Sequence, residues 1–120
     1  MAYTFLILGG EHNGHEALAA TDRKRPVIVD SKHYSVVLEN DKIRVLRIRY
    51  GPHEKSTMHG HPALVGVMLT NGQIRFTYPD GRTEDIFAVA GQVLQFPAHE
   101  HLPENLGDQP FEVIVVEFKS

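Results

Sequence analysis

Two pairs of histidines have a spacing that suits metal binding. The sequence contains His59-x-His61 and His99-x-His101. In a β-strand, residues i and i+2 point to the same face and lie roughly 7 Å apart, so two such imidazoles can approach one ion. Either pair alone carries little weight, because histidines also collect in surface turns. Two pairs, each beside an apolar segment, predict the two halves of one metal site.

The composition excludes most other chemistry. The chain has 120 residues, eight histidines and no cysteine. Disulfides, thiolate zinc fingers, iron–sulfur clusters and cysteine nucleophiles are therefore excluded. The sequence shows no nucleophile–base pair, phosphate-binding loop or dinucleotide fingerprint. The net charge of −3 gives no field that would attract a phosphate backbone, so we expect no nucleic-acid partner.

Length and hydrophobic patterning predict one soluble domain. A hydrophobic content of 42% is ordinary for a globular protein of this size. The apolar runs have the length of strands and fall short of the roughly 18 to 20 residues that span a membrane. The first of them, Tyr3–Leu8, lacks a basic start and a small-residue cleavage site after it. We therefore expect a cytoplasmic protein that does not contact membranes.

From Val27 onward, short β-branched and aliphatic runs alternate with turn residues. This pattern predicts an all-β sandwich or small barrel without helices. We expect residues 27–120 to form this domain and residues 1–26 to form an N-terminal arm. The expected strands are Val27–Asp30, Tyr34–Glu39, Ile43–Tyr50, Leu64–Thr70, Gln73–Tyr78, Asp85–Val89, Val93–Phe96 and Phe111–Lys119.

The turns and one irregular strand set the expected pairing. Asn71–Gly72 and Asp80–Gly81 predict tight hairpins, so that neighbouring strands pair antiparallel. In Ile43–Tyr50 the alternation slips between Val45 and Leu46, which predicts a β-bulge. We expect the arginines of this strand to form a solvated face rather than to bind a substrate carboxylate.

The surroundings of both histidine pairs resemble the two sequence motifs of the cupin superfamily. The residues that match the first motif are Gly51, His59, His61 and Gly72. Those that match the second motif are Gly91, Pro97, His101 and Asn105. The resemblance covers residues 27–119. It implies a small cupin jelly-roll barrel, or double-stranded β-helix, similar to quercetin-dioxygenase-like cupins and to those associated with β-alanine degradation.

The sequence also departs from these motifs. The position that carries a metal-binding glutamate in many cupins falls on Val65, with Gly66 beside it, and neither side chain offers an oxygen ligand. A histidine, His99, occupies the position of a glycine in the second motif. Gly51 stands farther before His59 than the glycine of the first motif does. The resemblance therefore implies a site without its carboxylate ligand.

Carried over to this chain, the motifs imply that His59, His61 and His101 bind one divalent transition metal ion. Iron, nickel, zinc, manganese and copper all suit imidazole ligands. His99 is included among the metal-site residues as a fourth nitrogen, with a supporting or purely solvated role as the alternative. His53 is a second candidate for that fourth position.

The remaining polar residues near the motifs are expected to be incidental. By strand alternation Glu100 points away from its neighbouring histidines into solvent. Three histidines outside the motifs are expected to be exposed, namely His12, His15 and His33.

Two functions remain open from the resemblance. One is a non-haem, metal-dependent dioxygenase or lyase that acts on a small organic acid or diketone-like substrate inside the barrel. The other is a non-catalytic metal or small-molecule binding module accessory to catabolism. An ion held by imidazoles alone keeps more positive charge and favours anionic or enolate-like ligands. Small cupins are often homodimers, and Tyr3–Leu8 would suit pairing with a partner's sheet edge.

Overall fold

The computed structural model describes residues 24–119 and is almost entirely β, as the sequence predicts. Its elements are α2 (Pro26–Val29), β1 (Tyr34–Glu39), β2 (Ile43–Tyr50), β3 (His59–His61), β4 (Leu64–Met68), β5 (Gly72–Thr77), β6 (Thr83–Ala88), β7 (Val93–Phe96), β8 (His99–Asn105) and β9 (Phe111–Phe118). Within these residues, no helix has the length and apolar character needed to cross a bilayer. Most of the arm, with Tyr3–Leu8, His12 and His15, lies outside the described residues.

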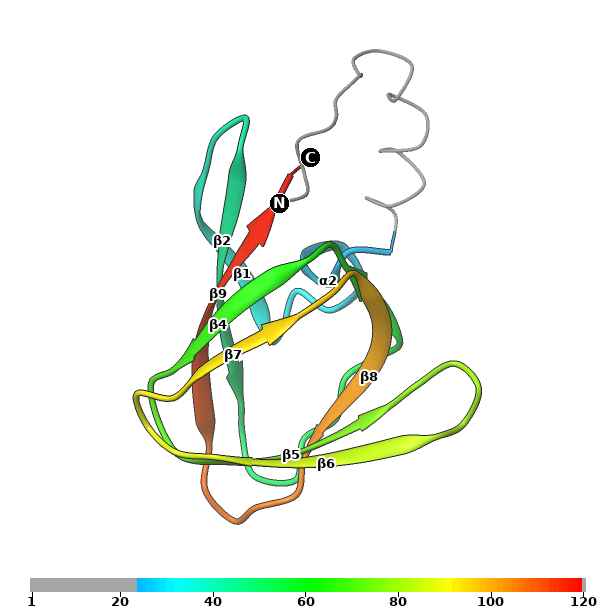
Figure 1. Cartoon of the computed structure of the whole chain (residues 1–120). Helices are drawn as coiled ribbons and strands as arrows, with labels where there is room; N and C mark the ends of the chain where they lie inside the picture. Colours follow the sequence, from blue (N-terminus) through cyan, green and yellow to red (C-terminus); the bar gives the residue numbers. More distant parts are fainter. Residues whose placement is uncertain (1–23, 120) are drawn as a thin grey trace.

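The strands form two antiparallel sheets that enclose a barrel (Figure 1). One sheet has the order β1-β2-β9-β4-β7 and the other has the order β3-β8-β5-β6. Strands distant in sequence therefore lie side by side, as β2 and β9 do. Alternate residues point inward, and in β9 these include Phe111, Val113 and Val115, all buried. The predicted jelly-roll barrel is confirmed. A homodimer is not tested by one chain and stays a prediction.

The segment predicted as the strand Val27–Asp30 is instead the short helix α2. Pro26 starts it, because the fixed φ of proline suits the first helical turn. The carbonyl oxygen of Pro26 accepts a hydrogen bond of 2.7 Å from the Asp30 amide. The β-branched residues of the segment suggested a strand, but the proline and the local turn bonds decide the conformation. The expected boundary after residue 26 falls inside this helix.

Only one of the two predicted hairpins forms. Asp80–Gly81 joins the paired strands β5 and β6, and Gly81 adopts the positive φ of 91° that the turn needs. Asn71–Gly72 instead carries the chain from β4 in one sheet to β5 in the other. A Cβ atom at Gly72 would lie 2.9 Å from the Cε atom of Met68, so a larger residue there would require that side chain to shift. The same dipeptide therefore serves a crossover rather than a hairpin.

The predicted bulge lies on the neighbouring strand. β2 pairs with β9 without a register shift, whereas β1 shifts against β2 between Val36 and Leu38. With its alternation intact, β2 buries Arg44 and exposes Arg47 and Arg49. The expectation of a solvated arginine face is therefore wrong for Arg44, which is 8% exposed.

Both histidine pairs lie on strands that the pattern did not predict. Their sequences lack the alternation of apolar and polar residues on which strand prediction depends. The second pair begins β8, which continues through Pro103 to Asn105. The inward positions of these strands carry imidazoles, whereas those of the other strands are mostly apolar, and this difference creates the site.

Candidate metal centre

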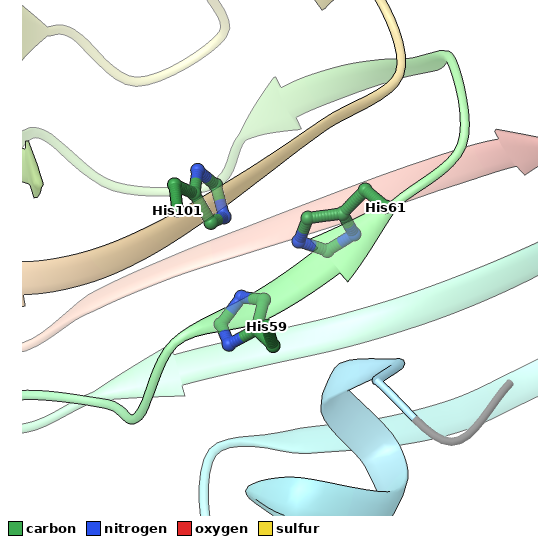
Figure 2. Close-up of side chains that lie close together, drawn as sticks. All are labelled: His59, His61 and His101. Atoms are coloured by element: carbon green, nitrogen blue, oxygen red, sulfur yellow. The ribbon is translucent and has the colours of Figure 1, made fainter. Parts of the chain in front are cut away.

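The facing strands β3 and β8 bring three histidines together. In their antiparallel pairing His59 lies opposite His101, and His61 lies opposite His99. Figure 2 shows the rings of His59, His61 and His101 gathered between the strands. All three are buried, and one ligand atom from each lies within 4.8 Å of those of the other two. This group could hold one metal ion.

Hydrogen bonds orient the first two rings. His59 donates from Nδ1 to the carbonyl oxygen of Thr57 at 2.9 Å. His61 donates from Nδ1 to Oε2 of Glu117 at 2.6 Å. We assign these protons from the network, because carbonyl and carboxylate oxygens only accept. Each Nε2 therefore keeps its lone pair, which is the form that binds a metal.

His99 sets the orientation of the third ring. Its Nδ1 donates to the carbonyl oxygen of Pro97 at 2.7 Å. Its Nε2 then accepts a hydrogen bond of 2.9 Å from Nδ1 of His101. This leaves a lone pair on Nε2 of His101, which is buried and has no hydrogen-bond partner among the described residues. A buried nitrogen without a partner is costly unless a ligand satisfies it, so the donor set fits a metal ion.

Burial keeps the imidazoles of His59 and His101 neutral. Desolvation, followed by the nearby His61, lowers the pKa of His59 to about 3. Desolvation also lowers the pKa of His101 well below its ordinary value, with smaller contributions from His61 and His59. Metal ions bind the neutral ring, so no proton has to be displaced at neutral pH.

A cavity of about 60 Å³ adjoins this group. Its polar lining residues are Tyr34, Tyr50, His61, His99 and His101. The rest of the lining is apolar or glycine, with Ile48, Phe76 and Val115 among it, and it includes no Asp, Glu, Lys or Arg of the described chain. Such a space suits a small ligand with one polar end directed at the imidazoles.

The barrel matches solved structures. A cupin domain from Bordetella pertussis Tohama I superposes with a TM-score of 0.67 at 25% identity, covering 72% of this chain and 92% of that chain. The chain has the cupin fold. A cupin 2 conserved barrel domain protein from Salinispora arenicola has a TM-score of 0.57 at 19% identity, covering 77% and 80% of the two chains. The polyketide cyclase RemF from Streptomyces resistomycificus has a TM-score of 0.54 at 18% identity, covering 71% and 63%.

These matches support membership of the cupin superfamily, as the two motifs predicted. No family model and no curated protein sequence matches the chain.

The asparagine of the second cupin motif has a structural role here. Asn105 is buried and donates to the carbonyl oxygens of Gly51 and Gln109 at 3.0 and 2.8 Å, which fastens the loops beside the barrel.

The glutamate position of the cupin motif requires a correction. Val65 points out of the barrel, whereas Gly66 points inward and lines the cavity. The position that faces the histidines is therefore Gly66 and not Val65. A Cβ atom at Gly66 would lie 3.3 Å from Cγ2 of Val115, so a larger residue there would require a small shift of that side chain.

A carboxylate lies behind the cluster instead. Glu117 of β9 is 0% exposed and binds His61 through Oε2, while its Oε1 lies 3.4 Å from Nη1 of Arg44. No motif pointed to Glu117. The available signal was the alternation of β9, because Glu117 follows Val113 and Val115 at an inward position. A charged residue in such a position requires a buried partner.

Tyr34 was also missed. Its hydroxyl lies 3.2 Å from Nε2 of His59 and 2.7 Å from the hydroxyl of Tyr50. Burial, and then the neighbouring Tyr50, raises the pKa of Tyr34 well above its ordinary value. The phenol is therefore a hydrogen-bonding group and carries no charge.

The structure does not bring His99 or His53 into the group of three. Both ring nitrogens of His99 are used in the bonds to Pro97 and His101. His53 has a side chain that is 62% exposed, and its Nε2 lies 2.7 Å from Oδ1 of Asp108. A fourth nitrogen ligand therefore stays a prediction, and the geometry favours the supporting role for His99.

Two further expectations have different outcomes. Glu100 does point away from the histidines and forms an ion pair of 2.9 Å with Lys24. His33, however, is 6% exposed and not a surface residue. Its Nδ1 lies 2.7 Å from Oδ2 of Asp30 and its Nε2 lies 3.0 Å from Oε1 of Glu54. The two carboxylates compensate its burial; Asp30 is only three residues away, whereas Glu54 comes from a distant part of the sequence.

Proposed function

We propose that this cupin binds one divalent transition metal ion through the Nε2 atoms of His59, His61 and His101. The observation that carries the proposal is the buried Nε2 of His101, which lacks a partner among the described residues while its ring is fixed by His99. Iron, nickel, zinc, manganese and copper all accept three imidazoles. An ion held by these three residues would supply Lewis acidity for a bound substrate or dioxygen.

We propose that the protein is a non-haem, metal-dependent dioxygenase or lyase for a small organic acid or diketone-like substrate. The quercetin-dioxygenase-like resemblance of the motifs supports this class. The cavity supports the substrate class, since its lining includes no carboxylate that would offset a divalent charge. Its apolar walls exclude water and favour the carbon skeleton of a compact anion.

A second candidate is a non-catalytic module that binds a metal or small molecule. One observation favours it. Among the described residues, the cavity lining offers no carboxylate or lysine as a general acid or base, and its histidines already serve the proposed metal site or support it. A lyase would therefore have only the two tyrosines for proton transfer, whereas a binding module needs no such group.

Elemental analysis of the protein, purified without a histidine tag, tests the metal site. We expect about one ion per chain in the parent and none in His59→Ala or His101→Ala. His53→Ala is the matched control, because its side chain is exposed and lies outside the cluster. A metal-free parent that also fails to take up added Fe, Ni, Zn, Mn or Cu would contradict the proposal.

Oxygen uptake with a panel of small keto acids and diketones then separates the two functions. The dioxygenase proposal predicts uptake by the metal-loaded parent and none by His61→Ala. Formation of a product without oxygen consumption would indicate a lyase. Saturable ligand binding with no turnover under either condition would favour the binding module.

A further inference from the structure

Two buried tyrosines lie beside the histidine cluster and have no part in the proposed coordination. Tyr34 begins β1 and is 4% exposed, and Tyr50 ends β2 and is 1% exposed. The ring of Tyr50 stacks on His33 at 4.2 Å between centroids and on Phe111 at 5.1 Å. These contacts fix Tyr50, so its hydroxyl holds the Tyr34 hydroxyl 2.7 Å away in a defined place.

The Tyr34 hydroxyl is directed at the cavity end where an ion would sit. It lies 3.2 Å from Nε2 of His59, and the two rings meet edge to face with centroids 4.9 Å apart. Tyr34 also lines the cavity. If the Nε2 lone pair is used by an ion, it no longer accepts the Tyr34 O–H group. That proton must then be donated to Tyr50 or to a ligand in the cavity.

The surrounding network allows either orientation. The hydroxyls of Tyr34 and Tyr50 lie 2.7 Å apart, and either oxygen can be the donor. Tyr34 can therefore donate to Tyr50 when the cavity holds no anion. A hydrogen bond to an ionised oxygen is roughly twice as strong as one between neutral groups. An anionic oxygen in reach thus favours the other orientation, in which Tyr50 donates to Tyr34 and Tyr34 donates to the ligand.

We infer that Tyr34 donates a hydrogen bond to the anionic oxygen of a small carboxylate or enolate held in the cavity, with Tyr50 as its positioning residue. The inference rests on the proposed metal site, because the ion supplies the charge that attracts the anion. Tyr34 adds selectivity for an oxygen that can accept a hydrogen bond. Neither residue lies in the two motifs that suggested the histidine ligands.

The test is a titration of the cobalt-loaded protein with acetate, followed through the visible spectrum of the ion. We expect Tyr34→Phe to keep its cobalt affinity within about threefold and to bind acetate about tenfold more weakly. Acetamide, which has the same shape but a neutral carbonyl oxygen, should lose less affinity in the variant than acetate does. Tyr78→Phe is the matched control, since its hydroxyl binds Glu84 at 2.6 Å and lies outside the cavity lining.

The possible failures are distinguishable. A parent that binds no cobalt would overturn the proposed metal site itself. Normal cobalt binding with the same acetate affinity in Tyr34→Phe, or loss of cobalt from that variant, would overturn only the role of Tyr34. If the variant does not fold, the zinc-loaded parent gives a second measurement by proton NMR. A tyrosine hydroxyl resonance that moves farther downfield with acetate than with acetamide supports the inference, and equal or absent shifts overturn it.

Discussion

The two histidine pairs have the same spacing but different surroundings. In the first pair, His59 and His61 both enter the group of three, and their Nδ1 atoms bind Thr57 and Glu117. In the second pair only His101 enters, and its Nδ1 is bound by His99. The second pair therefore supplies one candidate ligand together with that ligand's own hydrogen-bond partner.

The difference follows from what lies behind each ring. A ligand imidazole needs an acceptor at Nδ1 to fix its tautomer and orientation. β9 places Glu117 behind His61, and the chain before β3 places a carbonyl behind His59. Behind His101, the acceptor for Nδ1 is the Nε2 atom of His99 on the same strand. His99 is itself oriented by its hydrogen bond to the carbonyl oxygen of Pro97. Equal spacing in sequence thus gives unequal roles in space.

The largest expected effect separates the two pairs directly. His61→Ala should abolish stoichiometric metal binding, because it removes one of only three ligands. His99→Ala should lower metal affinity by about 10- to 100-fold and keep the stoichiometry, as loss of a group that supports a ligand does. Chelator competition measures both affinities. Complete loss of metal in His99→Ala would instead make His99 a ligand.

Acid should destabilise the metal-free protein through the same residues. The pKa of His59 is about 3 in the folded chain and near 6.5 when unfolded, so the unfolded chain binds the proton more readily. The resulting loss in the free energy of unfolding is negligible above pH 6.5. It reaches on the order of 3 kcal/mol at pH 4. Urea unfolding between pH 7 and 4 measures it.

His59→Gln should flatten that pH dependence more than His99→Gln does. Burial lowers the pKa of His99 too, but its ring is only half-buried. His53→Gln, at an exposed position, serves as the control and should leave the profile unchanged. Equal flattening by all three variants would contradict the contrast between the pairs.

Glu117→Gln should weaken metal binding by about 10- to 100-fold, because the amide is a poorer acceptor for Nδ1–H of His61. Glu112→Gln is the matched control on the same strand. Its carboxylate binds the exposed Arg47 and does not contact the histidines. We expect Glu112→Gln to leave metal affinity within about twofold, as removal of a surface ion pair does. Similar losses in both variants would indicate a general effect on β9.

The smallest effect concerns the missing carboxylate of the cupin motif. Gly66→Glu should place a carboxylate in the cavity, raise metal affinity and weaken acetate binding to the cobalt-loaded protein. Val65→Glu should change neither quantity, because that side chain points outward. Circular dichroism checks that Gly66→Glu folds despite the close Val115 side chain. A larger effect from Val65→Glu would reverse the assignment of the inward position.

The sequence by itself determined the elements whose pattern is local. Runs of β-branched and aliphatic residues between turn residues predicted β1 and β2 with their observed limits, because such runs are a property of neighbouring residues. The strand period of two predicted that His59 and His61 share a face. The cupin motifs then gave His101 as their partner, and the structure brings these three together.

Only the tertiary structure decided what surrounds those three rings. Glu117, Tyr34 and the supporting position of His99 all depend on which strand lies beside which, and on the register between them. The crossover at Asn71–Gly72 shows the same limit, since its local sequence suits a hairpin equally well. Pairing between distant strands is fixed by burial of a common core. A local pattern of residues therefore does not predict which strands pair or in what register.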